Sequence, residues 1–156
     1  MSKYLLKNPK LEGGLAMTEL AIVMPVCLFL LLATIELGRG FMQYNSMTKT
    51  IRDGARFAAE LARTSAGTTG IATFNAGDIN RVRNLVVFGN IGGTGSPILP
   101  GLTASNVTVT SPSSGDIAVR INYAYQPVFF SIESFGLGND INPNFVFQNE
   151  ITMRVL

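Results

Sequence analysis

The hydrophobic residues of this chain follow three different patterns. Residues 13–35 form an almost unbroken apolar run, and within residues 36–63 apolar side chains recur every three or four positions. From residue 107 onward, apolar and polar residues alternate. The first pattern is typical of a membrane-spanning helix, the second of an amphipathic helix, and the third of strands with one buried face. We therefore predict an α+β fold, in which one long N-terminal transmembrane helix packs against a small antiparallel β-sheet head.

The apolar run contains a single charged residue, Glu19. The 16 uncharged residues from Leu20 to Ile35 are few for a membrane span. The 23 residues from Gly13 to Ile35 would extend for about 35 Å as a helix, which is enough to cross a hydrocarbon core of about 30 Å. A carboxylate inside a span is costly and marks a candidate functional site. The whole run can span a membrane only if the charge of Glu19 is neutralised.

The residues around Glu19 resemble a type IV prepilin signal. Glu19 is the fifth residue after Gly14, and three lysines precede the glycine: Lys3, Lys7 and Lys10. In that family a membrane-bound peptidase cuts after the glycine, so the resemblance implies a leader of residues 1–14 and a cut between Gly14 and Leu15. The new α-ammonium group could then pair with the Glu19 carboxylate of a neighbouring subunit, so that two charges that are costly in lipid become one ion pair.

Two other interpretations of this region stay open. Glu19 lies near the end of the run and could simply reach the membrane interface. An ordinary secretory signal peptide would be cut after its apolar core, but the residues from Glu36 to Arg39 offer no site of small residues. Pro25, inside the run, removes a helical hydrogen bond and is expected to bend the helix. Cys27, the only cysteine, is expected to be a small buried residue without a disulfide partner.

The helix is expected to continue beyond the apolar run to residue 63, because residues 36–63 contain no proline and are rich in helix formers. We predict a membrane half at 15–37 and an amphipathic half at 38–63. The stripe expected to face the head is mostly apolar: Phe41, Tyr44, Thr48, Ile51, Ala55, Ala58 and Ala62. Off this stripe, Arg56 is placed to pair with Asp53 and Glu60. The glycines Gly38, Gly40 and Gly54 are expected where helices pack closely.

A second resemblance covers residues 13–60. A prepilin-type cut, an apolar helix with an internal proline, Glu-x-Gly-Arg, and an Arg-Asp-Gly-Ala-Arg block together resemble the TadE family. These proteins are minor pilins or pseudopilins of the tight-adherence (Flp, type IVc) pilus system. The residues that match are Gly14, Glu19, Pro25, Glu36, Gly38, Arg39, Gly54, Ala55 and Arg56. Many Flp-type signals have an aromatic residue after the glutamate, where this chain has Leu20. The resemblance implies a pilin-like fold.

Residues 64–156 are predicted to form the α+β head. Residues 66–77 and 89–105 are small, polar and rich in glycine, which predicts loops. Between them Asp78 is a candidate N-cap for a short helix at 79–88. The alternating residues predict a hairpin at 107–125, with its turn at 112–116, and a closing strand at 145–155. A short helical piece is expected near 129–135.

Composition excludes several classes of function. Residues 15–156 carry nine basic and nine acidic residues, so no nucleic-acid-binding surface is expected. The chain has no histidine and a single cysteine, so the commonest nucleophile–base pairs and metal-ligand clusters are missing. We therefore expect no enzyme activity, no cofactor and no metal site. The lysines of the leader predict that the N-terminus stays on the cytoplasmic side of the membrane.

Two function hypotheses follow. The first is a structural minor pilin or pseudopilin, inserted in the bacterial cytoplasmic membrane, cut by prepilin peptidase, and assembled into or initiating a tight-adherence pilus for surface attachment. Its partners would be other pilin subunits, the peptidase, the assembly machinery and, before assembly, membrane lipid. The major Flp pilins are much shorter, which favours a minor role. The alternative is an uncleaved, membrane-anchored adaptor on the periplasmic side of a secretion or pilus apparatus.

Overall fold

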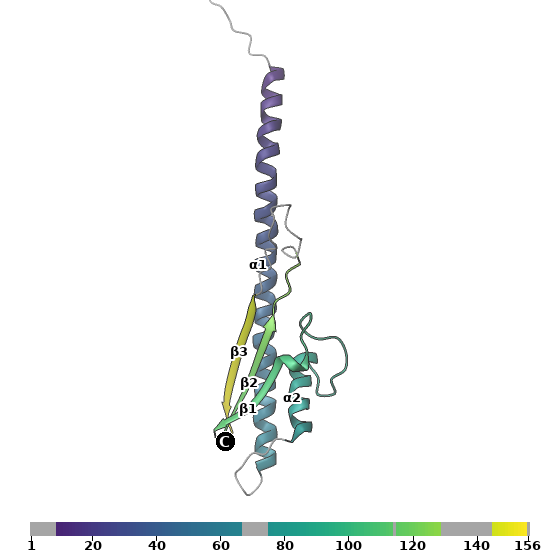
Figure 1. Ribbon diagram of the computed structural model, residues 1–156, viewed down its shortest axis with the longest axis vertical. Coiled ribbons are helices and arrows are strands. Elements are labelled where there is room, and N and C mark those ends of the chain that lie inside the picture. The colour runs from purple at the N-terminus through teal and green to yellow at the C-terminus, as the bar shows by residue number, and fades with distance from the viewer. Residues whose placement is uncertain (1–8, 67–74, 114, 129–144, 156) are drawn as a thin grey trace, which may run out of the picture. The chain divides into compact units, whose positions relative to one another are not determined.

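The computed structural model describes residues 9–66, 75–113, 115–128 and 145–155 (Figure 1). The chain divides into two compact units, residues 1–38 and residues 39–156. The first helix, α1 (Pro9–Ala66), contributes residues to both units. The predicted helix at 15–63 is confirmed as a single element, but it begins six residues earlier and ends three residues later. Proline suits the first position of a helix, because the N–H that it lacks would have no partner there.

The second unit adds one helix, a short 3₁₀ turn and three strands. Helix α2 spans Ala76–Phe88 and the 3₁₀ turn η1 spans Ala104–Asn106. The strands are β1 (Val107–Ser113), β2 (Asp116–Ala124) and β3 (Val146–Arg154). They form one antiparallel sheet in the order β1-β2-β3. The predicted α+β fold, with its hairpin and its closing strand, is confirmed.

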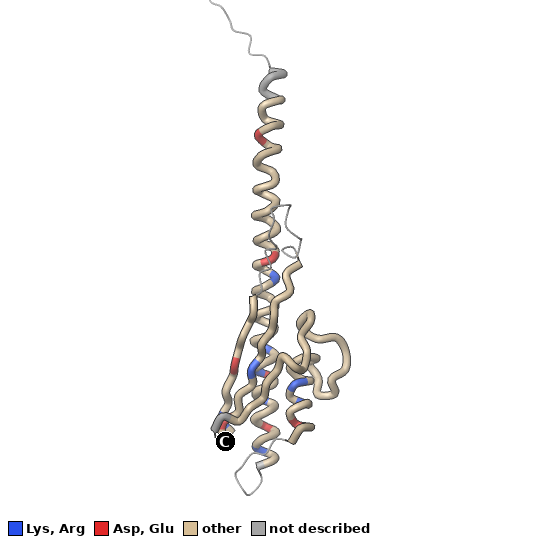
Figure 2. Tube along the Cα trace, viewed as in Figure 1, with Lys and Arg blue, Asp and Glu red and all other residues tan. Residues whose placement is uncertain are grey.

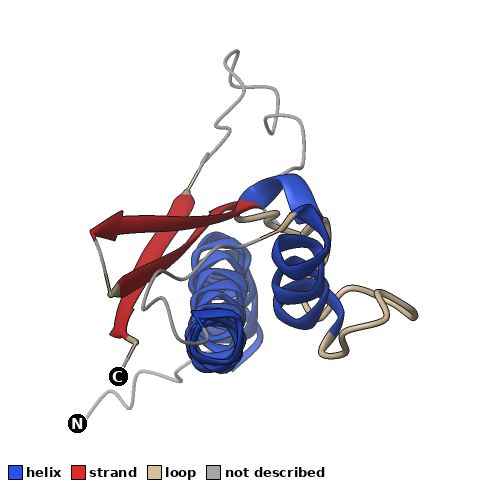
Figure 3. Cartoon of the chain, turned by 90° about the horizontal axis from the view of Figure 1, so that it is seen from below, coloured by secondary structure: helices blue, strands red, loops and turns tan. Residues whose placement is uncertain are grey.

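The register of the sheet places one face toward the helices. Val119 of β2 lies opposite Val109 of β1 and Ile151 of β3. Side chains of β2 alternate in burial from Val119 to Ala124, because successive residues of a strand point to opposite faces. Figure 3 shows the sheet along one side of α1 and helix α2 along another. The sheet, α2 and the 39–66 segment of α1 thus enclose the core of the second unit.

The N-cap of α2 differs from the prediction. Asn75, not Asp78, caps the helix, because the side-chain oxygen of Asn75 accepts a hydrogen bond from the backbone N–H of Asp78 at 2.8 Å. Helix α2 therefore begins three residues earlier than predicted. Gly89 ends it in a left-handed conformation, with φ of 74°. The predicted helical piece at 129–135 and most of the predicted loop at 66–77 lie outside the described residues.

The buried face of α1 is partly that of the predicted stripe. Ile51, Ala55, Ala58 and Ala62 are buried, as predicted, but Phe41 is 62% exposed and Tyr44 is 42% exposed. Met47 and Gln43 are buried in their place. From Gln43 to Ala55 the buried positions follow steps of four, whereas the predicted stripe alternates steps of three and four; steps of four rotate slowly around a helix with 3.6 residues per turn. The predicted stripe and the buried positions therefore lie on increasingly different faces of α1 toward the N-terminal end of the second unit.

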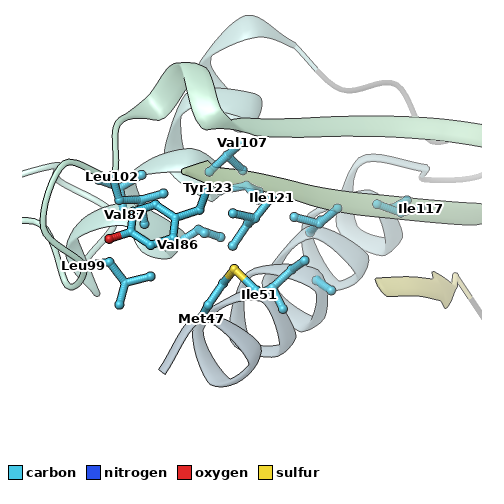
Figure 4. Packing of buried hydrophobic residues seen from close by; sticks show 14 of the residues in the cluster. Met47, Ile51, Val86, Val87, Leu99, Leu102, Val107, Ile117, Ile121 and Tyr123 are labelled. Carbon is cyan, nitrogen blue, oxygen red and sulfur yellow. The ribbon is translucent and has the colours of Figure 1, made fainter. Parts of the chain in front are cut away.

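The core holds buried side chains from both helices, β1 and β2 (Figure 4), and partly buried side chains of β3 pack against it. Tyr123 is its largest fully buried side chain and is only 1% exposed. Its hydroxyl group lies 2.8 Å from the carbonyl oxygen of Pro100 and 3.1 Å from Oε1 of Gln43. Tyr123 thus joins β2 to α1 and to the loop after α2. This contact explains why Gln43, a polar residue, is among the buried positions of α1.

Candidate membrane-spanning and assembly segment

The apolar N-terminal part of α1 is exposed in the chain by itself. Every side chain from Leu15 to Leu31 is exposed. By length and composition α1 is apolar enough to cross a membrane, with a mean hydropathy of 2.5 over an 18-residue window that is only 6% buried. A core helix of a soluble domain would be mostly covered, whereas the part of the chain that the structure describes leaves this segment without cover. Lipid or other apolar helices can provide it.

Glu19 is the only charged residue between Gly14 and Ile35 (Figure 2). It lies one helical turn after Leu15, so the two residues share a face of α1, about 6 Å apart along the axis. If the chain began at Leu15, its α-ammonium group would lie at the same end of the helix as this carboxylate. The positive end of the helix dipole would favour a carboxylate there as well.

The bond between Gly14 and Leu15 lies inside α1. The hydroxyl group of Thr18 donates to the carbonyl oxygen of Leu15 at 2.7 Å and lies 3.4 Å from that of Gly14. A hydroxyl at this position commonly bonds back to the preceding turn of a helix. Thr18 was not singled out from the sequence. Its hydroxyl thus contacts the carbonyl groups on both sides of the bond between Gly14 and Leu15.

Pro25 and Cys27 lie further along the same segment. Helix α1 continues through Pro25 without ending, and the bend expected at this residue stays a prediction. Cys27 is exposed, so the expectation that it is buried was wrong for the chain by itself. The reason is that no described part of the chain covers this stretch of the helix.

The other residues of the family motif occupy different environments. Glu36 is buried, and Gly54 and Ala55 face the core of the second unit. Arg56 lies on the exposed face of α1, where it lines a shallow groove together with Asn45, Thr48, Lys49, Arg52 and Asp53. The predicted pairs of Arg56 with Asp53 and Glu60 are absent from the described residues, where Glu60 pairs with Arg63. The motif therefore does not gather into one site.

The glycines also differ from one another. A Cβ built on Gly54 would lie 2.3 Å from Cγ2 of Val86 in α2, so close helix packing is confirmed there. A Cβ on Gly40 would meet the ring of Tyr125 at 3.9 Å, which is ordinary contact. A Cβ on Gly38 would have no described atom within 4 Å. Only Gly54 among these three is needed for packing inside the described structure.

Among the titratable groups of the described residues, Tyr123 is the one whose pKa clearly changes. Burial raises the pKa of Tyr123 above its ordinary value of 10.0, and the Arg39 guanidinium acts in the opposite direction. Arg39 is half-buried and begins the second unit. In the described part of the chain, no three His, Cys, Asp or Glu side chains gather in a way that would hold a metal ion.

Comparison with known proteins bears on the N-terminal segment. No curated protein and no solved structure matches the chain. The model of a family described as "TadE-like protein" matches residues 14–56, which cover the apolar segment and the first 18 residues of the second unit. The sheet lies outside this match. The resemblance to TadE inferred from the sequence is thus confirmed: the chain carries a TadE-like N-terminal segment, which associates it with the Tad pilus system.

Proposed function

We propose that this chain is a structural minor pilin or pseudopilin of a tight-adherence pilus. It is inserted in the cytoplasmic membrane by its N-terminal helix, cut between Gly14 and Leu15, and then assembled into the pilus or used to initiate it. The leader, with its three lysines, stays on the cytoplasmic side and the head lies outside. The TadE-like match over residues 14–56 supports this assignment.

The observation that carries the proposal is the exposure of the apolar segment. Large apolar side chains from Leu15 to Leu31 are uncovered, and the segment contains one charge. Membrane lipid covers such a surface before assembly, and the same helices of other subunits cover it afterwards. A filament subunit needs an apolar helix that can leave lipid and pack against the same helix of other subunits. This role requires no catalytic group in the chain.

Glu19 makes assembly depend on cleavage under this proposal. Before the cut its carboxylate lacks the α-ammonium group that the cut creates at Leu15. After the cut, the ammonium group of one subunit and the Glu19 carboxylate of its neighbour neutralise each other within the apolar core of the filament. The other partners are the prepilin peptidase and the assembly machinery in the membrane.

One observation favours the alternative, an uncleaved membrane-anchored adaptor. Helix α1 crosses the bond between Gly14 and Leu15 without interruption, and the Thr18 hydroxyl bonds to the carbonyl of Leu15. A regular helix resists a peptidase, because a protease needs an extended backbone in its site. An adaptor would keep its leader and would present the head to a partner as an uncleaved protein.

The N-terminus of the mature protein separates the two functions. Intact mass and N-terminal sequencing of the membrane-extracted protein should give Leu15 as the first residue in cells with an active prepilin peptidase. The Gly14→Val variant should stay uncut, because the added bulk lies directly before the cut, whereas Gly13→Val, its matched control, should be processed. Recovery of Met1 or Ser2 as the first residue of the wild type in such cells would favour the adaptor.

A further inference from the structure

Exposed apolar side chains of the second unit gather at the end that follows the apolar segment in sequence. Phe41, Met42 and Tyr44 lie in the first two turns of this unit, and Phe145 and Val146 lie where β3 begins. Phe41 is 62% exposed, Met42 73% and Phe145 61%. The other exposed large apolar residues described in this unit are Ile91, Ile98 and Val128. The exposed apolar surface is therefore concentrated and not scattered.

We call the aromatic residues at this end of the unit the aromatic collar (Phe41, Tyr44, Tyr125, Phe145 and Phe147). Phe41, Tyr44 and Phe145 are its exposed members, whereas Tyr125 is buried and Phe147 is half-buried beneath them. The ring of Phe147 meets Tyr44 edge-on at 5.7 Å and lies 5.5 Å from the ring of Tyr125. The backbone N–H of Tyr125 donates to the carbonyl oxygen of Phe145 at 2.8 Å. The ends of β2 and β3 are thus fixed beside the start of this unit's segment of α1.

The covalent chain places the collar close to any membrane that the apolar segment crosses. Leu37, the last residue of the predicted membrane half, is followed by Phe41 after four residues of continuous helix, a rise of about 6 Å. The interfacial region on each side of the hydrocarbon core is about 5–8 Å thick. Residues 41–44 must therefore lie at the level of the lipid headgroups or directly beside them.

The chemistry of the collar suits that region. Tyrosine is favoured where an apolar layer meets water, because its ring is apolar and its hydroxyl group can form hydrogen bonds. The exposed rings of Phe41 and Phe145 are purely apolar and can lie against the acyl-chain side of the same layer. Arg39 supplies a cation for lipid phosphate, and its long side chain can keep the charged group in the polar layer. No acidic residue occurs between Arg39 and Thr48, so nothing in this stretch repels the phosphates.

We propose that the aromatic collar is a membrane-binding surface, which lies in the headgroup region of a phospholipid bilayer before the subunit is assembled. Lipid is the occupant that the short connection to the apolar segment requires. The proposal rests on the proposed function, because it assumes that the apolar segment crosses a membrane. It adds that the head itself binds the lipid surface and is not merely tethered to it.

The chain contains no tryptophan, so a single inserted tryptophan reports on one position alone. The full chain is placed in phospholipid vesicles as four variants: Phe41→Trp and Phe145→Trp in the collar, Leu28→Trp in the apolar segment, and Ile91→Trp in the loop after α2. All four positions are exposed. Fluorescence is then measured with lipids brominated either near the headgroup end or near the methyl end of their acyl chains.

We expect both collar variants to lose emission with the shallow bromines and to emit at shorter wavelength than Ile91→Trp, which should keep its emission. Leu28→Trp should lose most emission with the deep bromines. Quenching of Leu28→Trp without quenching of either collar variant would overturn the collar proposal and leave membrane insertion intact. No quenching of Leu28→Trp would overturn insertion itself and the collar proposal with it. Collar emission at short wavelength that depends on protein concentration but not on bromine would show that a second copy covers the collar, and would also overturn the proposal.

Discussion

Gly54 of α1 and Val86 of α2 lie so close together that a methyl group on Gly54 would be 2.3 Å from Cγ2 of Val86. Real Cβ atoms essentially never come this close to another atom, and the branched side chain of Val86 has little freedom to move away. Both residues are buried in the core of the second unit. The absence of a side chain at Gly54 is therefore what allows the two helices to pack at this distance.

Gly54→Ala should lower the stability of the second unit. Alanine favours helix over glycine by about 1 kcal/mol, but overpacking a core costs about 1–3 kcal/mol. Gly38→Ala is the matched control, because a Cβ there meets no described atom within 4 Å, and it should leave stability unchanged or raise it. Chemical unfolding of the full chain in detergent micelles, followed by circular dichroism, measures both.

A double variant tests the cause. Val86→Ala removes the atom that a methyl group on Gly54 would strike. The double variant should therefore lose less free energy of unfolding than the sum of the losses of the two single variants. Strict additivity of the two changes in the free energy of unfolding would show that the close approach is not what makes Gly54 necessary.

Tyr123→Phe should destabilise the second unit at neutral pH. The change removes the hydroxyl whose single proton is shared between the Gln43 Oε1 and the Pro100 carbonyl oxygen, and it leaves a buried amide oxygen without this partner. Leaving a buried acceptor unsatisfied costs about 1–3 kcal/mol, so a loss of that size is expected. Tyr44→Phe, at a side chain that is 42% exposed, is the control and should change the free energy of unfolding little.

The raised pKa of Tyr123 also predicts an alkaline loss of stability. Because the folded state holds the phenolic proton more tightly than the unfolded state, the contribution is fully present below pH 10.0. As the pH rises through that value the unfolded chain ionises first, and the folded state becomes less stable until the phenol of Tyr123 ionises as well. The free energy of unfolding should be measured from about pH 8 to 11, a range that brackets the ordinary tyrosine pKa. It should fall more steeply with pH for the wild type than for Tyr123→Phe. Parallel curves would contradict the assignment.

The register of β2 predicts opposite results for two adjacent substitutions. Ile121 is fully buried and its neighbour Asn122 is exposed on the other face of the sheet. Ile121→Asp places an unpaired charge in the core and should cost several kcal/mol, enough to unfold the unit. Asn122→Asp should be tolerated, with a change within about 0.5 kcal/mol. Loss of the strand signal in circular dichroism for both variants, or for neither, would contradict this register.

Glu19→Gln tests the proposed pairing in assembly. The neutral amide is cheaper in lipid than a carboxylate, so the variant should insert normally, and cleavage should persist at least in part. Incorporation should fail, because the ammonium group of a neighbour's Leu15 would be buried without its counter-charge. Removing one member of a buried pair costs about 3–5 kcal/mol, a factor of over a hundred in an equilibrium.

The measurement is the share of cleaved protein found in sheared pili, or crosslinked to pilus machinery, at equal expression. Glu60→Gln, which changes an exposed carboxylate of the second unit, is the matched control and should be incorporated like the wild type. An equal share for Glu19→Gln and the wild type would mean that Glu19 makes no assembly contact and only reaches the membrane interface.

The sequence by itself determined the features that rest on local periodicity. The apolar run at 13–35, the spacing of three and four that follows it, and the alternation from residue 107 predicted the long helix, the hairpin and the closing strand. In each pattern the spacing of the apolar residues shows whether a helix or a strand would place them on one face. That spacing depends only on residues that are close in sequence. The motif from Gly14 to Arg56 likewise sufficed to indicate the TadE-like segment, because it is a matter of residue types and spacing.

Only the tertiary structure decided which face of α1 is buried near its junction with the sheet. Phe41 is more apolar than Gln43, yet Gln43 is buried, because the hydroxyl of Tyr123 reaches it from a strand 80 residues away in the chain. The need for a glycine at position 54 likewise depends on Val86 in another helix. Such choices follow from contacts between segments that are far apart in sequence, so no local pattern can contain them.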